Sequence, residues 1–331
     1  MDGPALPYFD ESRGEWIFSR YADVMAALRE PLLWPPASSP RDSSGRLLLR
    51  APSQEALARI AEWEPRISAL AQRALDRLPP AGAVDLLADY ALRWCLGVAL
   101  LVVQARSEDI TRLNDLGTQV FAATGAPDDS PLKPRAAAAT AELVRHFADG
   151  PMPMGEPTFI AISQTTPRLL ASTWLALLRH PEQAAQLAAN PGLWPSAADE
   201  LLRYAGIVRR IRREARGPVD VAGVSLAQGQ RVMLMLATAN RDPAQFPAPD
   251  RLDFTRPSAP HFALGWGRNS CIGAHLLRVL IKESTRALWA RFPDLRLCLE
   301  PEYRTGSGYH FPVALFTQFL QPVNIPGTPR L

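Results

Sequence analysis

Residues 261–280, HFALGWGRNSCIGAHLLRVL, decide the fold of this chain. They place one cysteine, Cys271, between a glycine-rich turn and an amphipathic stretch that predicts a helix after Gly273. Free backbone N–H groups and the positive end of the dipole at a helix start favour the thiolate form of a cysteine. A sulfur in this position is therefore a metal ligand or a nucleophile.

The residues around Cys271 indicate what this sulfur binds. Gly265, Gly267 and Gly273 let the backbone approach a flat or bulky group closely. No second Cys or His stands nearby at zinc-ligand spacing, so a single thiolate points to haem. A phosphate-binding loop is excluded, because GWGRNS lacks a third glycine and a Walker lysine and follows a proline-rich segment instead of a strand.

Composition predicts one globular domain. The 331 residues are 47% apolar and 21% charged, and no low-complexity linker, charge block or repeat divides them. Lys and Arg total 36 against 33 Asp and Glu, and this balance argues against a nucleic-acid partner.

Location is predicted from the N-terminus, the apolar runs and the cysteines. Residues 1–16 lack the features of a signal peptide, and the apolar run from Trp94 is judged too short to span a bilayer. Cys95, Cys271 and Cys298 are an odd number at wide spacing, as in a reducing compartment. We expect a cytoplasmic protein with no membrane partner, in which Cys95 and Cys298 are inert core residues.

Hydrophobic periodicity predicts a mainly α protein with small β-sheets, an α+β fold. Helical spacing dominates up to Gly206, with Pro65 as a break and Ser196 as an N-cap. Residues 217–240 alternate in short pieces and predict a β-unit, and residues 241–260 form a proline-rich meander. A long helix and closing strands follow.

The motifs, in this order, resemble those of the cytochrome P450 family. FALGWGRNSCIGA is similar to the family's cysteine-ligand loop, and ELLR carries Glu200 and Arg203 of its Glu-x-x-Arg helix. Arg251 in FPAPDRLDF stands where a meander arginine joins this pair, so the three residues are expected to form a structural charge network. The resemblance implies a P450-like helical fold that binds haem b through Cys271.

The same resemblance implies how the haem is held. Arg213 stands at the position of a propionate-binding arginine. Asn269 occupies a position where His or Arg is common, and adjacent Arg268 either takes over this role or faces solvent. Further cofactor-binding candidates in the cysteine loop are His261, Leu264, Gly265 and Gly273.

The oxygen-activating helix departs from the family pattern of a small residue, Gly, any residue, an acid and Thr. The chain reads AISQTT, with Ile162 at the glycine, Gln164 at the acid and Thr165 at the alcohol, followed by Thr166. Gln164 can organise water but cannot titrate. Alternatively, these polar residues are ordinary members of a partly buried helix. Pro167 still allows the helix to kink.

Length is a second departure. Compared with bacterial relatives, the single haem domain expected over residues 1–331 is shortened at the N-terminus and around 147–158, in the region of the lid over the distal pocket.

The substrate side is predicted to be apolar. Arg209 either holds a substrate carboxylate or is a solvated or propionate-facing charge, and the closing turn with Tyr309 either touches substrate or is a surface turn. The candidate pocket residues are Phe159, Ala161, Ile162, Val208 and Arg209.

The preferred function is a haem-thiolate monooxygenase that acts on a small or medium organic molecule in bacterial specialised metabolism. Electrons would come from a separate ferredoxin-type donor attracted by Arg268, Arg278 and Lys282. The alternatives are a haem-thiolate enzyme that works without reductant, by dehydration, rearrangement, cyclisation or peroxide use, and a non-catalytic haem-binding partner protein.

Overall fold

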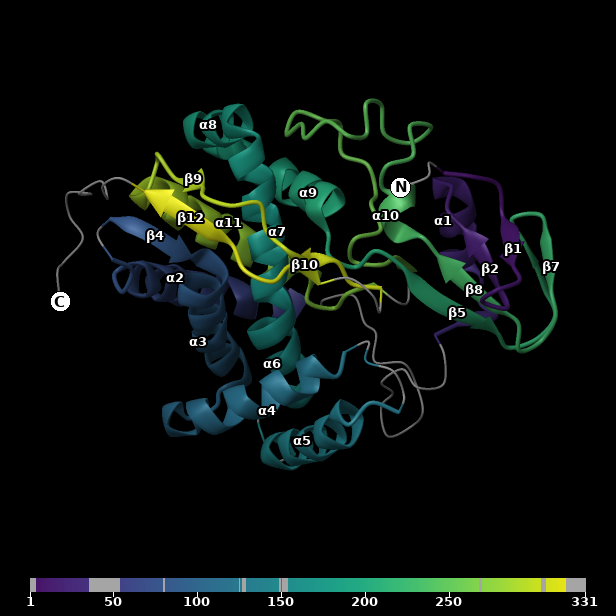
Figure 1. Ribbon diagram of the computed structural model, residues 1–331, viewed down its shortest axis with the longest axis horizontal. Helices are drawn as coiled ribbons and strands as arrows, with labels where there is room; N and C mark the ends of the chain where they lie inside the picture. Colours follow the sequence, from purple (N-terminus) through teal and green to yellow (C-terminus); the bar gives the residue numbers. More distant parts are fainter. Residues whose placement is uncertain are drawn as a thin grey trace. The chain divides into compact units, whose positions relative to one another are not determined.

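The structure is a computed structural model that describes residues 4–35, 54–79, 81–124, 126, 129–148, 150, 154–267, 270–304 and 308–319. The chain divides into two compact units (Figure 1). Unit 1 comprises Met1–Leu57, Pro191–Arg278 and Gly308–His310, and unit 2 comprises the remaining residues. Each unit is described by itself, and the single haem domain expected from the sequence stays a prediction.

Unit 1 is built on a five-stranded sheet with the order β1-β2-β8-β5-β3. Its one parallel pair is β2 with β8, in which Phe18 lies opposite Leu234. The strands of unit 1 are β1 (Tyr8–Asp10), β2 (Glu15–Phe18), β3 (Leu33–Trp34), β5 (Ile211–Ala215), β6 (Val219–Val221), β7 (Val224–Leu226) and β8 (Arg231–Leu234). Residues 219–234 thus form the predicted β-unit.

Helices pack against this sheet and carry the candidate site. Tyr21 in α1 stacks on Phe262, with ring centroids 4.5 Å apart, and its backbone N–H donates to Asp242 at 2.8 Å. The remaining elements are α1 (Tyr21–Arg29), α9 (Trp194–Ala205), α10 (Leu236–Ala239) and the start of α11 (Ala274–Arg291). Apolar packing around α1 therefore fixes the segment that leads to Cys271.

Unit 2 is mainly helical and contains the central helix. That helix has three parts: α6 (Gly155–Ile160), a π-helical turn (Ala161–Thr165) and α7 (Thr166–Arg179). The other helices are most of α2 (Gln54–Leu75), a π-helical turn (Leu86–Ala91), α3 (Leu92–Val103), α4 (Ile110–Ala122), α5 (Leu132–Phe147), α8 (Pro181–Ala189) and the rest of α11. The strands are β4 (Gly82–Asp85), β9 (Arg296–Leu297), β10 (Tyr303–Arg304), β11 (Phe311–Pro312) and β12 (Phe316–Phe319).

A group of buried aromatic residues forms the centre of unit 2. Tyr90 stacks on Trp174 and Trp94, with ring centroids 5.3 and 6.2 Å apart. The indole N–H of Trp174 donates to Thr285 at 3.1 Å, and that of Trp94 donates to the Ile67 carbonyl at 3.1 Å. Each buried polar tip has a partner, as stable burial of tryptophan requires.

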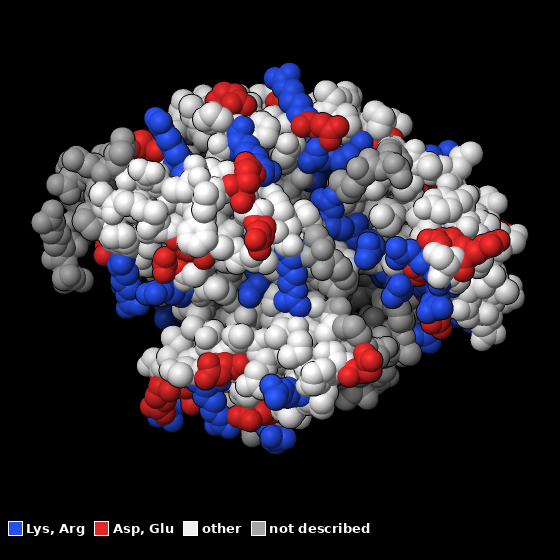
Figure 2. Space-filling model, viewed as in Figure 1, with Lys and Arg blue, Asp and Glu red and all other residues white. Residues whose placement is uncertain are grey.

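Helices α4 and α5 lie side by side in unit 2 (Figure 1). An ion pair between Arg112 Nε and Glu142 Oε1, at 2.7 Å, joins them. Figure 2 shows basic and acidic side chains interspersed over these two helices. This mixed surface agrees with the nearly balanced charge of the sequence.

The connection between α5 and α6 is short, where the sequence predicted a missing segment. Helix α5 ends at Phe147 and α6 begins at Gly155. A Cβ at Gly155 would lie 2.7 Å from the Cβ of Phe147, so only glycine permits this approach. The central helix therefore starts directly against the end of α5.

Two local predictions are wrong. Pro65 does not break α2, which is continuous, because its exposed ring lies on the solvent side of the helix. Ser196 is not an N-cap, since α9 begins at Trp194 and the Ser196 hydroxyl donates to the carbonyls of Leu193 and Phe254. Pro195 explains the earlier start, because proline is favoured in the first helical turn.

The apolar run from Trp94, which the sequence predicted to be too short for a membrane span, is part of a longer apolar segment. The window Leu86–Val103 has 18 residues and is apolar enough to span a bilayer by length and composition. However, 61% of this window is buried inside the protein, as in the core helix of a soluble protein. The expected cytoplasmic location stays a prediction.

Candidate functional site

Cys271 lies in unit 1, three residues before α11 begins, as the sequence predicts. Its backbone N–H donates to the Leu264 carbonyl at 2.8 Å, and its carbonyl accepts from Ala274 N–H at 3.2 Å. Gly265 and Gly267 have φ angles of +71° and +64°, which glycine adopts without strain. The glycines thus produce the turn that brings the cysteine to the helix start.

The thiol of Cys271 is less acidic than its position suggests. Its side chain reaches solvent. Desolvation by the surrounding protein still raises the pKa of the thiol, although the Gly273 N–H and the Arg278 charge act in the opposite direction. Desolvation therefore outweighs the Gly273 N–H and the Arg278 charge in their effect on the pKa of this thiol. A bound metal ion deprotonates a coordinating thiol outright.

A buried charge network holds the meander against α9. Arg203 donates to Glu200 through two nitrogens, at 2.7 and 2.8 Å. The predicted third member, Arg251, is wrong: its exposed side chain does not complete the pair, and it supplies only its carbonyl, 3.3 Å from Arg203. Arg256 takes this place, with its Nε 3.2 Å from Glu200 Oε1. The sequence offers both meander arginines, and only the fold distinguishes them.

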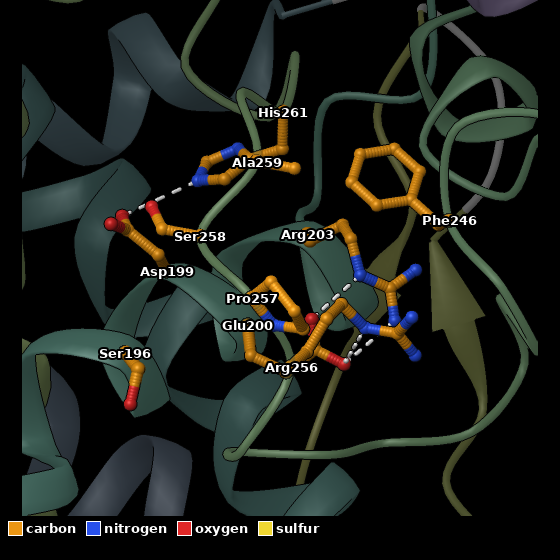
Figure 3. A pocket seen from close by; sticks show the side chains of 10 residues that line it. All are labelled: Ser196, Asp199, Glu200, Arg203, Phe246, Arg256, Pro257, Ser258, Ala259 and His261. Carbon is orange, nitrogen blue, oxygen red and sulfur yellow. Dashed lines mark hydrogen bonds and ion pairs between the residues drawn. The ribbon is translucent and has the colours of Figure 1, made fainter.

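A small cavity lies between α9 and the residues after the meander (Figure 3). Its volume is about 30 Å³, enough for a water molecule. Asp199, Glu200, Arg256 and His261 are among its lining residues. His261, predicted to bind the cofactor, instead uses its ring nitrogens within the protein: Nε2 lies 3.4 Å from Asp199 and Nδ1 accepts from Ala263 N–H at 3.3 Å.

Asn240 has a positioning role that sequence reasoning missed. Its side-chain oxygen accepts from the Phe262 N–H at 2.7 Å, and its carbonyl accepts from Arg203 at 2.8 Å. It therefore connects the charge network to the segment that leads to Cys271. The available signal was its place in ANRDP, which the sequence analysis used only as a family likeness.

Arg213 fits the propionate role expected from the sequence. It lies in β5, is 6% exposed, and donates through Nη1 to the Arg212 carbonyl at 2.8 Å. Its Nε has no hydrogen-bond partner within the described residues. Burial lowers the pKa of this guanidinium to about 10, so the group stays charged at neutral pH. A buried cation with an unsatisfied donor suits an anionic group such as a propionate. Arg268 and Asn269 lie outside the described residues.

Two candidate substrate segments of unit 1 are paired with each other. Val208 forms a β-bridge with Tyr309, and Arg209 N–H donates to the Gly308 carbonyl at 2.7 Å. A Cβ at Gly308 would lie 2.7 Å from the Arg210 carbonyl oxygen, so glycine is required. Burial and then the charge of Cys271 raise the pKa of Tyr309. The closing turn is thus part of the surroundings of Cys271.

In unit 2, the π-helical turn coincides with the altered oxygen-activation motif. Thr166 donates to the Ala161 carbonyl at 2.9 Å, so its hydroxyl closes this turn instead of being free for catalysis. Thr165 is half-buried, and no hydrogen bond ties its hydroxyl within the part of unit 2 that the structure describes. Single π-turns occur frequently at functional sites. The π-helical turn ends at Thr165, directly before Thr166 and Pro167, and the kink stays a prediction.

Two buried polar side chains in this turn lack partners. Ser163 and Gln164 are each 1% exposed, and Ser163 Oγ and Gln164 Nε2 have no hydrogen-bond partner in the described parts of the chain. The Gln164 amide lies beside Gly117 of α4, where a Cβ would be 3.2 Å from Nε2. Arg168 donates to the Gln164 carbonyl. Unsatisfied buried groups of this kind suit a bound water or ligand.

The predicted pocket residues of unit 2 do not share one environment. Phe159 is fully buried and packs on Phe147, with ring centroids 5.8 Å apart, and its place in the pocket lining stays a prediction. The short α5–α6 connection explains this packing. Ile162 is 5% exposed, whereas Ala161 is exposed.

Two residues of the predicted basic docking face are already paired. Arg278 Nε lies 2.7 Å from Asp199 Oδ1, and Lys282 pairs with Glu64 and Glu283.

The two cysteines predicted to be core residues differ in burial. Cys95 is buried, whereas Cys298 is exposed, so the prediction is wrong for Cys298. Cys298 directly follows β9, at a point where the chain reaches the surface.

Known proteins resemble the chain over most of its length. The sequence profile described as "Cytochrome P450" matches residues 193–286. Vitamin D(3) 25-hydroxylase of Pseudonocardia autotrophica is 30% identical over 331 aligned positions, which cover 86% of this chain and 82% of that protein. Because these 331 positions cover only part of the chain, some of them pair the relative with gaps in this chain.

Other comparisons differ in coverage. The biotin biosynthesis cytochrome P450 of Bacillus subtilis is 39% identical over 151 residues, and the match covers only 38% of that protein. The solved ligand-free structure of Mycobacterium smegmatis CYP164A2 is 26% identical, covers 94% of this chain and 92% of that chain, and has a TM-score of 0.80.

The fold and the cysteine segment define a haem-thiolate type of protein. The chain belongs to the cytochrome P450 family. Its class is that of the P450 oxidoreductases, and its cofactor is haem b. The cysteine before α11 and the unsatisfied buried guanidinium of Arg213 fit this cofactor.

Proposed function

We propose that the protein is a monooxygenase that binds haem b through Cys271 and oxidises a small or medium organic molecule. The observation that carries this proposal is the glycine turn that presents Cys271 at the start of α11, secured by the Glu200 and Arg203 network. When bound, haem b supplies the oxygen and electron chemistry of the reaction.

Individual side chains take separate roles in this proposal. Arg213 neutralises a propionate, which offsets the burial of its own charge. Leu264 and Gly265 hold the turn, and the Gly273 N–H donates to the sulfur. Arg268 is proposed as a second propionate cation, with Asn269 as a neutral neighbour. In these roles the positive charges of the site come from two arginines, whose guanidinium groups stay protonated at neutral pH.

Proton delivery is proposed to run through water held at the π-helical turn. Thr165 presents a hydroxyl that would donate or accept a hydrogen bond in this relay, and the Gln164 amide can hold a water molecule without titrating. Thr166 is left out of this relay, because its hydroxyl already bonds to the Ala161 carbonyl. The proton thus comes from water instead of a carboxylic acid.

The substrate is proposed to be largely apolar, with one polar anchor. The apolar candidates are Ile162 and Ala161 in unit 2 and, separately, Val208 in unit 1. Burial and then the nearby Arg241 lower the pKa of Arg209, and a carboxylate of the substrate would favour the charged form of this guanidinium. We propose a role in bacterial specialised metabolism, with a ferredoxin-type donor as partner.

A second candidate function rests on the missing acid. Gln164 cannot supply a proton for the activation of dioxygen. A peroxide or a pre-oxidised substrate would avoid that activation and would therefore need no reductant. The Thr165 hydroxyl, which no described residue of unit 2 binds, favours the monooxygenase. A non-catalytic haem-binding protein is a third possibility, which lack of ligand binding next to the iron would favour.

The first test is the absorption spectrum of the purified protein, oxidised and then reduced under carbon monoxide. We expect a strongly red-shifted Soret band in the wild type and its loss in Cys271→Ser, with the far-UV circular dichroism largely kept. Cys95→Ser is the matched control and should keep the band. A red-shifted band in Cys271→Ser would overturn the assignment. Oxygen uptake with an added bacterial ferredoxin and its reductase, compared with peroxide-supported oxidation, then separates the two enzyme classes.

A further inference from the structure

Helix α9 carries two consecutive acidic residues that serve different partners. Glu200 accepts from Arg203 and Arg256, as described above. Asp199 instead accepts from Arg278 Nε through Oδ1, at 2.7 Å, and the same oxygen lies 3.4 Å from His261 Nε2 (Figure 3). The second carboxylate therefore has partners outside the network that binds the meander.

These two partners flank the cysteine in the sequence. His261 precedes Cys271 by ten residues and Arg278 follows it by seven. His261 Nδ1 accepts from the Ala263 N–H, which leaves Nε2 as the protonated nitrogen that donates to Asp199. Arg278 also donates to the Ala274 carbonyl at 3.1 Å, so it holds the first turn of α11. One carboxylate thus joins both ends of the segment.

We propose that Asp199 is a positioning residue that fixes Cys271 by tying His261 and Arg278 to α9. The inference rests on the proposed function, in which Cys271 is the haem ligand. Glu200 and Asp199 then have different roles on α9. Glu200 holds the meander, and Asp199 holds the two ends of the segment that contains Cys271.

Exposure limits the size of the effect. The side chains of Asp199 and Arg278 are 37% and 36% exposed, so solvent screens their attraction. Partly exposed pairs contribute up to about 1 kcal/mol, which corresponds to about fivefold in a rate. The pair therefore adjusts how firmly the sulfur is held and is not required for folding.

The test measures how fast the reduced, carbon monoxide-bound protein loses its red-shifted Soret band during mild warming. We expect Asp199→Asn to lose it up to about fivefold faster than the wild type, because the amide keeps an acceptor for His261 but removes the charge that binds Arg278. Asp199→Glu should recover part of the difference. Asp250→Asn removes an exposed partner of Arg241 in the same unit and should leave the rate unchanged.

The outcomes distinguish this proposal from the assignment of the ligand. A wild-type rate in Asp199→Asn, or equal acceleration in Asp250→Asn, overturns the positioning role. Asp199→Asn combined with Arg278→Gln should lose the band no faster than Arg278→Gln alone, because the Asp199 contact is already lost in that single variant. A red-shifted band that persists in Cys271→Ser overturns the proposed function itself, whatever the Asp199 variants show.

Discussion

The cysteine segment of unit 1 and the π-helical turn of unit 2 treat buried polar groups in opposite ways. Glu200, Arg203 and Asn240 satisfy one another and the backbone through short hydrogen bonds. Ser163 and Gln164 are equally buried, yet each has a polar atom without a partner among the described residues. In the first region these buried groups have their hydrogen-bond partners within the protein. In the second region the unpartnered atoms can bind a water molecule or a ligand.

The largest expected effect on stability comes from disrupting the Glu200 and Arg203 network of unit 1. Glu200→Gln leaves the buried Arg203 charge uncompensated, and loss of one partner of such a pair reduces the free energy of unfolding by about 3–5 kcal/mol. Urea denaturation measures this change. Arg256→Gln should lower stability less, because Arg203 keeps both bonds to Glu200, and Arg251→Gln should have no measurable effect. An Arg251 variant as damaging as Arg256→Gln would contradict the corrected network.

Arg213 is the exception within unit 1, and its replacement should have effects of opposite sign. Its lowered pKa of about 10 means that the folded state holds the charged form less well than the unfolded state, so Arg213→Gln should raise the stability of the haem-free protein. The same variant should bind haem about tenfold more weakly, because an ionic hydrogen bond to a propionate is lost. Haem titration and urea denaturation of the haem-free protein measure the two effects. A fall in both would assign Arg213 a purely structural role.

Gln164→Glu tests whether the unsatisfied amide stands in for a lost acid. The new carboxylate can carry a proton, so reductant-coupled oxygen uptake should rise severalfold while peroxide-supported oxidation stays constant. Gln164→Leu is the matched control, which removes the polar group and should not raise uptake. An unchanged or lower rate in Gln164→Glu would show that water or substrate carries the proton.

The smallest expected effect is a gain. Ser163→Ala removes a buried hydroxyl that lacks a partner, so it should raise the free energy of unfolding by about 1 kcal/mol. Thr166→Ala is the contrast within the same turn, since its hydroxyl bonds to the Ala161 carbonyl and its loss should be destabilising. Thermal denaturation followed by circular dichroism measures both. Destabilisation by Ser163→Ala would indicate that this hydroxyl holds a structural water.

The sequence predicted those parts of the structure that depend on local pattern. The helix start after Cys271 and the Glu200 and Arg203 pair follow from spacing and residue type. The choice between Arg251 and Arg256 did not, because both lie in an irregular meander whose path is set by packing. The roles of Asp199 and Asn240 depend on contacts between distant segments, which no local pattern encodes.

The contact between α5 and α6 is another feature that the sequence did not predict. Phe159 was expected beside substrate because it is an apolar residue of the central helix. The connection brings α5 against α6 at Gly155, and Phe159 packs on Phe147. The position of an apolar residue along a helix does not reveal which side chain it packs against.

The ties from Asp199 to His261 and Arg278 have a consequence for how the protein acquires its cofactor during biosynthesis. They join protein groups only, so His261 and Arg278 can be held on α9 before haem arrives. A segment whose two ends are held in advance loses less conformational entropy when it captures a ligand. Haem loading then resembles the docking of a preformed part and places little demand on the order in which folding and cofactor delivery occur in the cell.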